Sequence, residues 1–454
     1  MNKLQRRFVV LASGLATLLG FQTATVVAQE DAAPGAYTQE APSQEGSAQE
    51  GSAQETSSQG EPYKREDDSR NPFTFTISES LNYNNNVYRL PDRVSNANAP
   101  KGKRSDSYSV TRVGMDFDTE HSRQAFHAGL SASQSLYSTH SSLNTTEWDA
   151  RLRWDWRMGN RLSGTIGYSH SGTAVKFEDV YTGSNPEELD GITRQLGRFR
   201  FGADFWWHPN WATGVGFSDV RNDYSNNARP YDEYNAQEAS LNLTYRPSTG
   251  NRIVFSLLTE RGQYPNRPRE EDLAPGETSM RDWKRHDARL TGHWQLTGVT
   301  QLSGYAGYTW RKYDLARNRD FDGPTGKIEF RWVPTGKAII NLGWRREIGA
   351  DLDTVSNFAV TQAWFLKPTW VVTSKIRLGA NYEHQKRDYR GDPGLGSAAL
   401  PRDAKTQLYG VNLQYIPVPY GSIALGYQHQ KRDATKRDDD YSARTAWLSG
   451  SLTF

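Results

Sequence analysis

The sequence predicts an all-β protein: a transmembrane antiparallel β-barrel of about 18 strands, with 16 also possible. Three observations predict this fold. Apolar and polar residues alternate at every second position from Phe73 to Phe454, short turn-rich links alternate with long polar stretches, and the amino terminus resembles a secretory signal. A signal peptide over residues 1–28 and a disordered tether over 29–70 are expected to precede a barrel over 71–454.

The composition favours a one-sided apolar surface and excludes several classes of protein. Aromatic residues make up 12% of the chain, with 14 Trp and 23 Tyr, whereas hydrophobic residues total 36% and the mean hydropathy is −0.79. The net charge of +2 provides no bulk electrostatic attraction for nucleic acid, so no nucleic-acid partner is expected. Cysteine is absent, which excludes disulfides, thiolate metal sites and a cysteine nucleophile. No metal and no cofactor are predicted.

The first 28 residues have the pattern of a cleaved signal peptide. Lys3, Arg6 and Arg7 form a positive segment, and a largely apolar run from Phe8 to Phe21 follows. This run is short for a membrane-spanning helix, and Val26-Val27-Ala28 fits a cleavage site before Gln29. The pattern predicts export from the cytoplasm and a place in the outer membrane of a Gram-negative bacterium.

Residues 29–70 form a low-complexity segment rich in Gln, Glu, Ser and Gly. The unit GSAQE occurs twice in tandem, at 46–50 and 51–55. Almost nothing in this segment can be buried, so it is predicted to be disordered. It is either a plain linker or a tether with a periplasmic contact of its own.

From residue 71 onward the period of two predicts strands. The first is Phe73, Phe75, Ile77, Leu81 and Tyr83 against polar neighbours, interrupted by Glu79, which is expected near a strand end. Eight short links and nine long polar stretches join 18 such segments. Trp207 and Trp211 are expected to flank one short turn, and Trp364 and Trp370 another at Lys367–Thr369, as members of an interfacial aromatic girdle.

The stretch EWDARLRWDWRMGNRLSG (147–164) indicates which face of the strands meets lipid and which meets the lumen. Its apolar set includes Trp154 and Trp156, and its charged set is Arg151, Arg153, Asp155 and Arg157. About 18 strands close to a cylinder too wide for side chains to fill. The apolar set is therefore predicted to face lipid, and the charged set to face an aqueous lumen.

The carboxyl-terminal segment YSARTAWLSGSLTF alternates to a terminal aromatic residue, Phe454. It resembles the terminal strand by which bacterial barrels are recognised, so the barrel assembly machinery is an expected partner. Outer-membrane lipid and lipopolysaccharide are the expected surroundings. Acidic loop clusters at 270–272 and 438–440 either bridge divalent ions to lipopolysaccharide or are simply solvated.

The candidate functional residues are those predicted to line the lumen. Guanidinium groups there would attract a polyanionic glycan; alternatively, the charges only balance one another and stiffen the wall. An inward tryptophan could guide sugar rings, or it could mark a bulge beside a turn. The candidates are Arg151, Arg153, Asp155, Arg157, Arg198, Arg200, Asp204, Trp206, Lys327, Glu329, Arg331, Lys375 and Arg377.

No enzyme is predicted. The nine histidines show no defensible spacing for a Ser/His/Asp triad, and His170 with Ser171 is the one local pair that an outer-membrane lipase could use. The segments GPTGK (323–327) and VPTGK (333–337) lack the spacing of a phosphate-binding loop and lead into strands, so they are interpreted as hairpin turns.

Three segments resemble a known family. NNNVYRLPD (84–92), RSDSYSVTRVGMDF (104–117) and WRMGNRLSGTIGYSH (156–170) are similar to the outer-membrane barrel proteins of exopolysaccharide biosynthesis operons, often called EpsL-type. The likeness covers roughly 71–454. It implies that the chain moves or anchors a secreted polysaccharide, with periplasmic export proteins as further partners. It also makes Tyr88 and Arg89, in a rim loop, candidate binding residues.

The function predicted from the sequence is therefore a porin that exports an exopolysaccharide across the outer membrane. Two alternatives stay open. A general or nutrient-uptake porin would pass small solutes, and a structural anchor of an export complex would not conduct at all.

Overall fold

The protein is described by a computed structural model that covers residues 71–175, 190–248, 250–272, 280–350, 358–390, 402–435 and 440–454. The predicted signal peptide (1–28) and tether (29–70) lie outside these residues. So does much of the predicted acidic loop cluster at 438–440.

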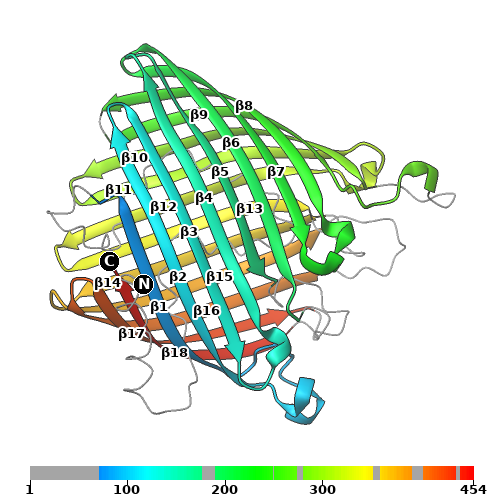
Figure 1. The fold of residues 1–454 in the computed structure, drawn as a ribbon. Coiled ribbons are helices and arrows are strands. Elements are labelled where there is room, and N and C mark those ends of the chain that lie inside the picture. The colour runs from blue at the N-terminus through cyan, green and yellow to red at the C-terminus, as the bar shows by residue number, and fades with distance from the viewer. Residues whose placement is uncertain are drawn as a thin grey trace, which may run out of the picture.

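The described chain forms one closed antiparallel barrel of 18 strands, as the sequence predicts (Figure 1). Each strand pairs with its neighbours in the chain, and β1 closes the barrel by pairing with β18 as well as β2. The strands are β1 (Phe73–Asn84), β2 (Asp106–His121), β3 (Gln124–Tyr137), β4 (Thr145–Met158), β5 (Leu162–Ala174), β6 (Thr193–His208), β7 (Trp211–Tyr224), β8 (Tyr234–Ser248), β9 (Asn251–Gln263), β10 (Asp282–Thr297), β11 (Thr300–Tyr313), β12 (Phe321–Thr335), β13 (Ala338–Ala350), β14 (Phe358–Val371), β15 (Ile376–Arg390), β16 (Arg402–Val418), β17 (Gly421–Ala434) and β18 (Tyr441–Thr453).

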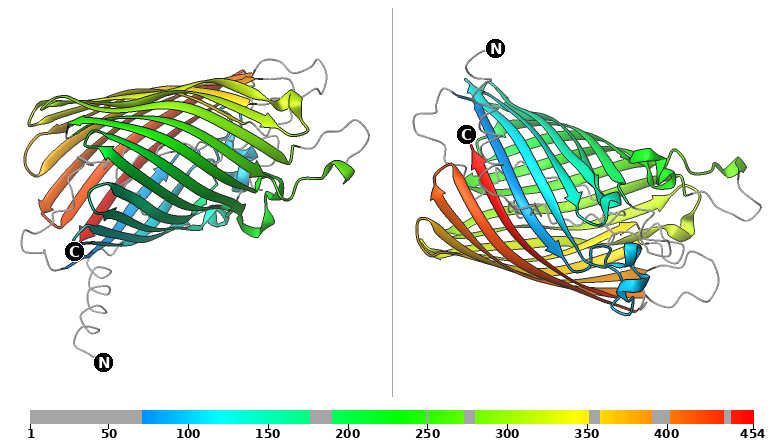
Figure 2. Two further views of the ribbon diagram at one scale, coloured as in Figure 1. Left: turned by 90° about the horizontal axis from the view of Figure 1, so that it is seen from above. Right: turned by 60° about the horizontal axis from the view of Figure 1, so that its bottom comes forward.

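Short links lie at one end of the barrel and long ones at the other, which is the arrangement of an outer-membrane barrel with short periplasmic turns (Figure 2). Short 3-10 helices occupy the long links, and among the described residues no helix is long and apolar enough to cross a membrane. The helices are η1 (Asn96–Asn98), η2 (Pro100–Gly102), η3 (Ser141–Leu143), η6 (Ser225–Asn227), η7 (Pro230–Asp232), η8 (Glu270–Asp272) and η9 (Arg317–Arg319).

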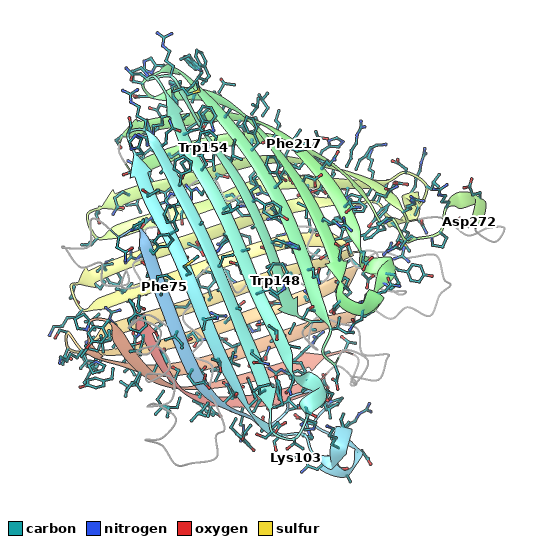
Figure 3. The ribbon with its side chains drawn as sticks, viewed as in Figure 1. Phe75, Lys103, Trp148, Trp154, Phe217 and Asp272 are labelled. Atoms are coloured by element: carbon teal, nitrogen blue, oxygen red, sulfur yellow. The ribbon has the colours of Figure 1, made fainter. Side chains whose placement is uncertain are left out.

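The outer face of the wall is apolar, as predicted. Leu152, Val113 and Leu425 are exposed although they lie in the middle of strands, and Phe75, Trp154 and Phe217 project from the same surface (Figure 3). The register places such side chains opposite one another from strand to strand around the barrel. An apolar belt with no protein cover is the surface that lipid covers, and the chain is an outer-membrane β-barrel.

Several aromatic side chains lie flat over a glycine on the neighbouring strand. Trp283 is paired with Gly262, and a Cβ placed on that glycine would lie 1.9 Å from the indole ring. Trp447 over Gly426 and Phe365 over Gly343 repeat this packing. The combination of many glycines and many aromatics therefore serves strand-to-strand packing in a wall that has no central core.

Two predicted turns are wrong. The segment GPTGK (323–327) lies inside β12, where its residues pair with β11. Lys367–Thr369 lies inside β14, and the turn comes later, at residues 372–375. Pro368 suggested a turn, but in the structure neither it nor Lys367 pairs with β15, so its missing N–H costs no ladder bond on that side. Trp364 and Trp370 consequently lie on one strand and share its outer face.

Glu79 is also misplaced by the sequence prediction. It lies in the middle of β1, not at an end, and its register partners are Gly450 and Thr111. Its neighbours on the same face, Ile77 and Leu81, belong to the apolar belt. The lipid-facing surface thus carries an exposed carboxylate near the level of its middle.

Replacing Glu79 with leucine is expected to raise the free energy of unfolding by about 1–2 kcal/mol, because a carboxylate on the lipid face costs less than the roughly 2–4 kcal/mol of a basic residue but is still unfavourable. Equilibrium urea unfolding in lipid vesicles measures the change. Glu120→Leu, at the periplasmic end of β2, serves as the control and should change little. A loss of stability in Glu79→Leu would show that Glu79 has a structural partner.

Candidate functional site: the barrel lumen

The side chains that alternate with the apolar belt line the inside of the barrel. On β4, the inward set includes Arg151, Arg153, Asp155 and Arg157, as predicted, because Leu152, Trp154 and Trp156 occupy the outward positions. Arg151 Nε lies 2.7 Å from Asp149 Oδ1, and Arg153 Nη2 lies 2.7 Å from Asp155 Oδ2. Their side chains are nevertheless 64% and 44% exposed, so the guanidinium groups remain open to the lumen.

The β6 candidates also face inward. Arg198, Arg200 and Asp204 alternate with outward Phe199, Phe201 and Phe205. Asp204 interacts electrostatically with Arg252 of β9. Together with β4, this strand forms what we term the open wall, defined by Arg151, Arg153, Arg157, Arg198 and Arg200.

Trp206 is inward and lies beside the bulge that one of the two sequence interpretations expects. The register shifts between Trp206 and His208, which is a bulge beside the turn. The indole Nε1 of Trp206 donates to Ser163 Oγ at 3.0 Å, and the guanidinium carbon of Arg246 lies 4.2 Å from the ring centroid. Trp206 is therefore an aromatic group held in place at the periplasmic end of the lumen.

Of the candidates on or next to β12 and β15, all but one are residues of the barrel wall. Lys327, Glu329 and Arg331 face inward, and Lys327 Nζ lies 3.0 Å from Glu329 Oε1. Arg377 faces inward on β15. Lys375, by contrast, is not in the wall: β15 begins at Ile376, so Lys375 lies in the preceding turn, where its ammonium donates to the Pro417 carbonyl at 3.1 Å.

The sequence analysis missed a network of buried charges on β8, β9 and β10. Arg285 Nη2 lies 2.9 Å from Glu260 Oε2 and 3.2 Å from Glu238 Oε2, and Arg285 Nε lies 3.4 Å from Asp287 Oδ2. Arg289 Nη2 is 4.0 Å from Asp287 Oδ2. The Arg285 side chain is only 5% exposed. We call these five residues the charge clasp.

An aromatic cluster adjoins the charge clasp on its extracellular side. Trp283 Nε1 donates to Glu260 Oε1 at 3.2 Å and so joins the two groups. Tyr264 packs against Trp283 with ring centroids 4.6 Å apart, and the Arg311 guanidinium lies 4.4 Å from the Trp283 centroid. Tyr234 and Tyr313 complete this buried cluster. The side chains of this cluster are buried, whereas Arg151 and Arg153 of the open wall are exposed.

The link between β1 and β2 carries the two rim-loop candidates. Tyr88 is 1% exposed; its hydroxyl donates to Asp190 Oδ2 at 3.0 Å and its ring meets His140 edge-on. Arg89 adopts a positive φ of 54°, and its Nη1 donates to the Asn86 carbonyl at 2.8 Å. Both side chains are engaged in holding the loop, and Tyr88 offers little surface to a solute.

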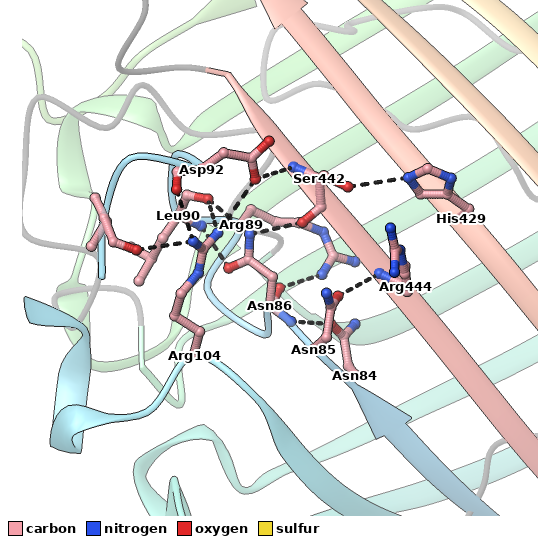
Figure 4. A network of polar contacts seen from close by, with 11 residues as sticks. Asn84, Asn85, Asn86, Arg89, Leu90, Asp92, Arg104, His429, Ser442 and Arg444 are labelled. Carbon is pink, nitrogen blue, oxygen red and sulfur yellow. Dashed lines mark hydrogen bonds and ion pairs between the residues drawn. The ribbon is translucent and has the colours of Figure 1, made fainter. Parts of the chain in front are cut away.

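The asparagines of this loop extend the seam between β1 and β18 (Figure 4). Beyond the last ladder pair, the Arg444 N–H donates to Asn85 Oδ1 at 2.6 Å and the Ser442 N–H donates to Asp92 Oδ1 at 3.2 Å. Asn86 Nδ2 donates to the Ser442 carbonyl at 3.1 Å. Side chains thus satisfy backbone groups of β18 that a longer β1 would have paired.

Two other kinds of site, a metal site and a serine–histidine pair, do not fit the geometry of the described residues. Within the described part of the chain, no group of three or more His, Asp or Glu side chains is placed to hold a metal ion. His170 and Ser171 lie on opposite faces of β5, His170 outward against Trp148 and Ser171 inward, so they do not form a dyad.

The chain is similar, at low identity, to solved structures of three outer-membrane proteins. No family model and no curated protein matches the chain. Among solved structures, OpdK of Pseudomonas aeruginosa with vanillate is 13% identical, with a TM-score of 0.43 over 84% of this chain and 99% of that one. OccAB4 of Acinetobacter baumannii is 9% identical, with a TM-score of 0.44 over 84% and 98%. The siderophore receptor PirA of A. baumannii is 7% identical, with a TM-score of 0.40 over 85% and 81%. At these values the likeness carries no argument about cargo.

Proposed function

We propose that this barrel is a passive pore of the porin type that favours anionic solutes. One observation carries the proposal: the open wall presents guanidinium groups to the lumen, with Arg151 64% and Arg153 44% exposed. A wall that served only as an anchor would have no need of solvated charge on its inner face. The barrel is closed and lipid-facing outside, so a solute that crosses has to pass this surface.

The mechanism follows from the chemistry of the guanidinium group. A planar guanidinium can give two parallel hydrogen bonds to a carboxylate or phosphate, and in a hydrated lumen these bonds exchange with water. Asp149 and Asp155 position the arginines of β4 and weaken their hold on a solute. The result is attraction that is strong enough to enrich anions and weak enough to release them. No energy source is required.

The lumen wall has a buried side and an exposed side. The charge clasp and its aromatic cluster form a stiff, poorly hydrated side of the lumen, which leaves the open wall as the hydrated path. An anionic nutrient or metabolite of modest size is therefore the first cargo that we propose. The sequence likeness to EpsL-type proteins supports a second cargo, an acidic exopolysaccharide moving outward.

The proposal is tested by neutralising three arginines of β4 together, Arg151→Gln, Arg153→Gln and Arg157→Gln. In single-channel recordings, monomeric glucuronate should interrupt the current of the parent barrel in a concentration-dependent way. The triple variant should need about tenfold more glucuronate for the same effect, since a hydrogen bond to a charged group contributes roughly 1.5–3 kcal/mol net and less where water competes for it.

The control and the cargo are examined in the same recordings. Arg123→Gln, in the β2–β3 turn, removes a charge outside the lumen wall and should leave the block unchanged. Long current interruptions by acidic oligosaccharides, rather than by glucuronate, would favour the polymer. A triple variant that is blocked as readily as the parent would contradict a role for the open wall.

A further inference from the structure

A polar cavity lies at the extracellular end of the seam between β1 and β18. It measures about 380 Å³ and is lined by Asn85, Asp92, Arg104, Ser442 and Arg444 (Figure 4). A volume of this size falls in the range of small-ligand sites, roughly 300–1,000 Å³. We call it the seam pocket.

The seam pocket opens on the outside of the barrel. Ser442 and Arg444 share the outward face of β18 with Ala446 and Leu448. Asn85 follows β1 two residues after outward Tyr83. Immediately below the pocket, Tyr83, Leu448 and Tyr427 of β17 are exposed members of the apolar belt. The pocket therefore sits at the boundary where lipid headgroups meet acyl chains.

The groups that line the seam pocket are suited to an anion. The Arg444 side chain is exposed, and its guanidinium makes no hydrogen bond or ion pair with the residues that the structure describes. Arg104 Nη2 lies 3.6 Å from Asp92 Oδ1, so two guanidinium groups face one carboxylate and the pocket is net positive. The side-chain Oδ1 of Asn85 accepts a hydrogen bond from the backbone N–H of Arg444. The side-chain Nδ2 of Asn85 is therefore left as a donor.

The neighbouring outward positions add a hydrogen-bond partner for Ser442 and an ion pair. His429 Nε2 lies 3.1 Å from Ser442 Oγ at the edge of the pocket, and Lys431 is the next outward residue of β17. Lys431 Nζ is 2.8 Å from Asp433 Oδ1, whereas the Arg444 guanidinium has no carboxylate partner among the described residues. The free guanidinium, next to an amide and a hydroxyl, is a donor set for a tetrahedral oxyanion.

We propose that the seam pocket binds a phosphate group of a phosphorylated glycolipid in the outer leaflet. Arg444, Asn85 and Ser442 hold the phosphate, and the acyl chains lie along Tyr83, Leu448 and Tyr427. A soluble phosphorylated sugar would share the phosphate contacts. The apolar surface directly beneath the pocket favours the lipid, because only the lipid covers it.

The test measures lipid retained by the full mature chain, purified in detergent and incubated with bisphosphorylated lipid A. Native mass spectrometry should show a bound lipid whose occupancy falls by about tenfold in Arg444→Gln and is partly restored in Arg444→Lys. The matched control is Lys312→Gln, which removes an outward cation from the extracellular end of β11, remote from the seam in the strand order. It should bind as the parent does.

Two further ligands distinguish a phosphorylated lipid from a soluble phosphorylated sugar as the occupant of the seam pocket. Lipid A without its phosphates should bind weakly to the parent, and the deacylated bisphosphorylated disaccharide should bind weakly as well. Strong binding of the disaccharide that depends on Arg444 would overturn the lipid as occupant in favour of a soluble phosphorylated sugar. Equal lipid occupancy in Arg444→Gln and Lys312→Gln would overturn the site itself.

Discussion

Arg285→Met is expected to lower the free energy of unfolding by about 3–5 kcal/mol, the usual effect of removing one partner from a buried ion pair. Three carboxylates, those of Glu238, Glu260 and Asp287, converge on this guanidinium within 3.4 Å. Without it they repel one another in a place that water reaches poorly. The wall formed by β8, β9 and β10 should then open before the rest of the barrel.

Urea unfolding of the folded barrel, followed by tryptophan fluorescence, measures this change, and Trp283 reports on the clasp because it donates to Glu260. Arg377→Met is the matched control: Arg377 is also an inward arginine, and no ion pair of its side chain is found among the described residues. It should lose less than about 1 kcal/mol. A parent-like unfolding curve for Arg285→Met would mean that the clasp is solvated and has no role in holding the wall.

Asn86→Ala is expected to cost about 2–4 kcal/mol and to weaken the closure of the barrel. The side chain is fully buried; its Oδ1 accepts from the Leu90 N–H at 2.9 Å, and its Nδ2 donates to the carbonyls of Leu90 at 2.8 Å and Ser442 at 3.1 Å. Truncation leaves these backbone groups without their partner, and each buried unpaired group costs about 1–3 kcal/mol.

The temperature at which the folded barrel unfolds in detergent should therefore fall in Asn86→Ala. Asn98→Ala, an exposed asparagine of the same loop, is the control and should unfold with the parent. If both variants unfold together, the asparagines contribute nothing to the seam. The seam pocket can be assayed in the same proteins, since loss of the loop should also loosen Asn85.

The sequence predicts the open wall correctly because an apolar residue marks the outward position beside each charge. Trp154 between Arg153 and Asp155 leaves one orientation for the strand. The charge clasp could not be predicted in the same way. Residues 283–287 read Trp, Lys, Arg, His, Asp, so this stretch alone does not mark its outward face, and Arg285 is placed inward only by an uninterrupted alternation back from Leu290.

The alternation of apolar and polar residues also does not predict the height of a residue along the barrel axis. Glu79 follows the period of two and so is correctly outward, but its level depends on where β1 begins and how β18 is aligned with it. The same holds for Lys375, which differs from a wall residue only because β15 begins one position later. Strand order and register, not residue type, decide such positions.

The rim loop shows a third limit. The motif NNNVYRLPD invites a binding interpretation for Tyr88 and Arg89, yet its asparagines act on the backbone of β18, a strand more than 350 residues away in sequence. A single sequence does not reveal such a contact. Arg444, the exposed cation of the seam pocket, belongs to the other strand of the seam.

The most direct test of the account is the reversal potential of the refolded chain from Gln29 onward, in a planar bilayer with a tenfold KCl gradient. We expect discrete open steps and a reversal potential of the sign that marks chloride as the more permeant ion, because exposed arginines dominate the open wall. A potassium-selective current would contradict an arginine-lined pore that is selective for anions. So would a barrel that is folded and inserted but never conducts.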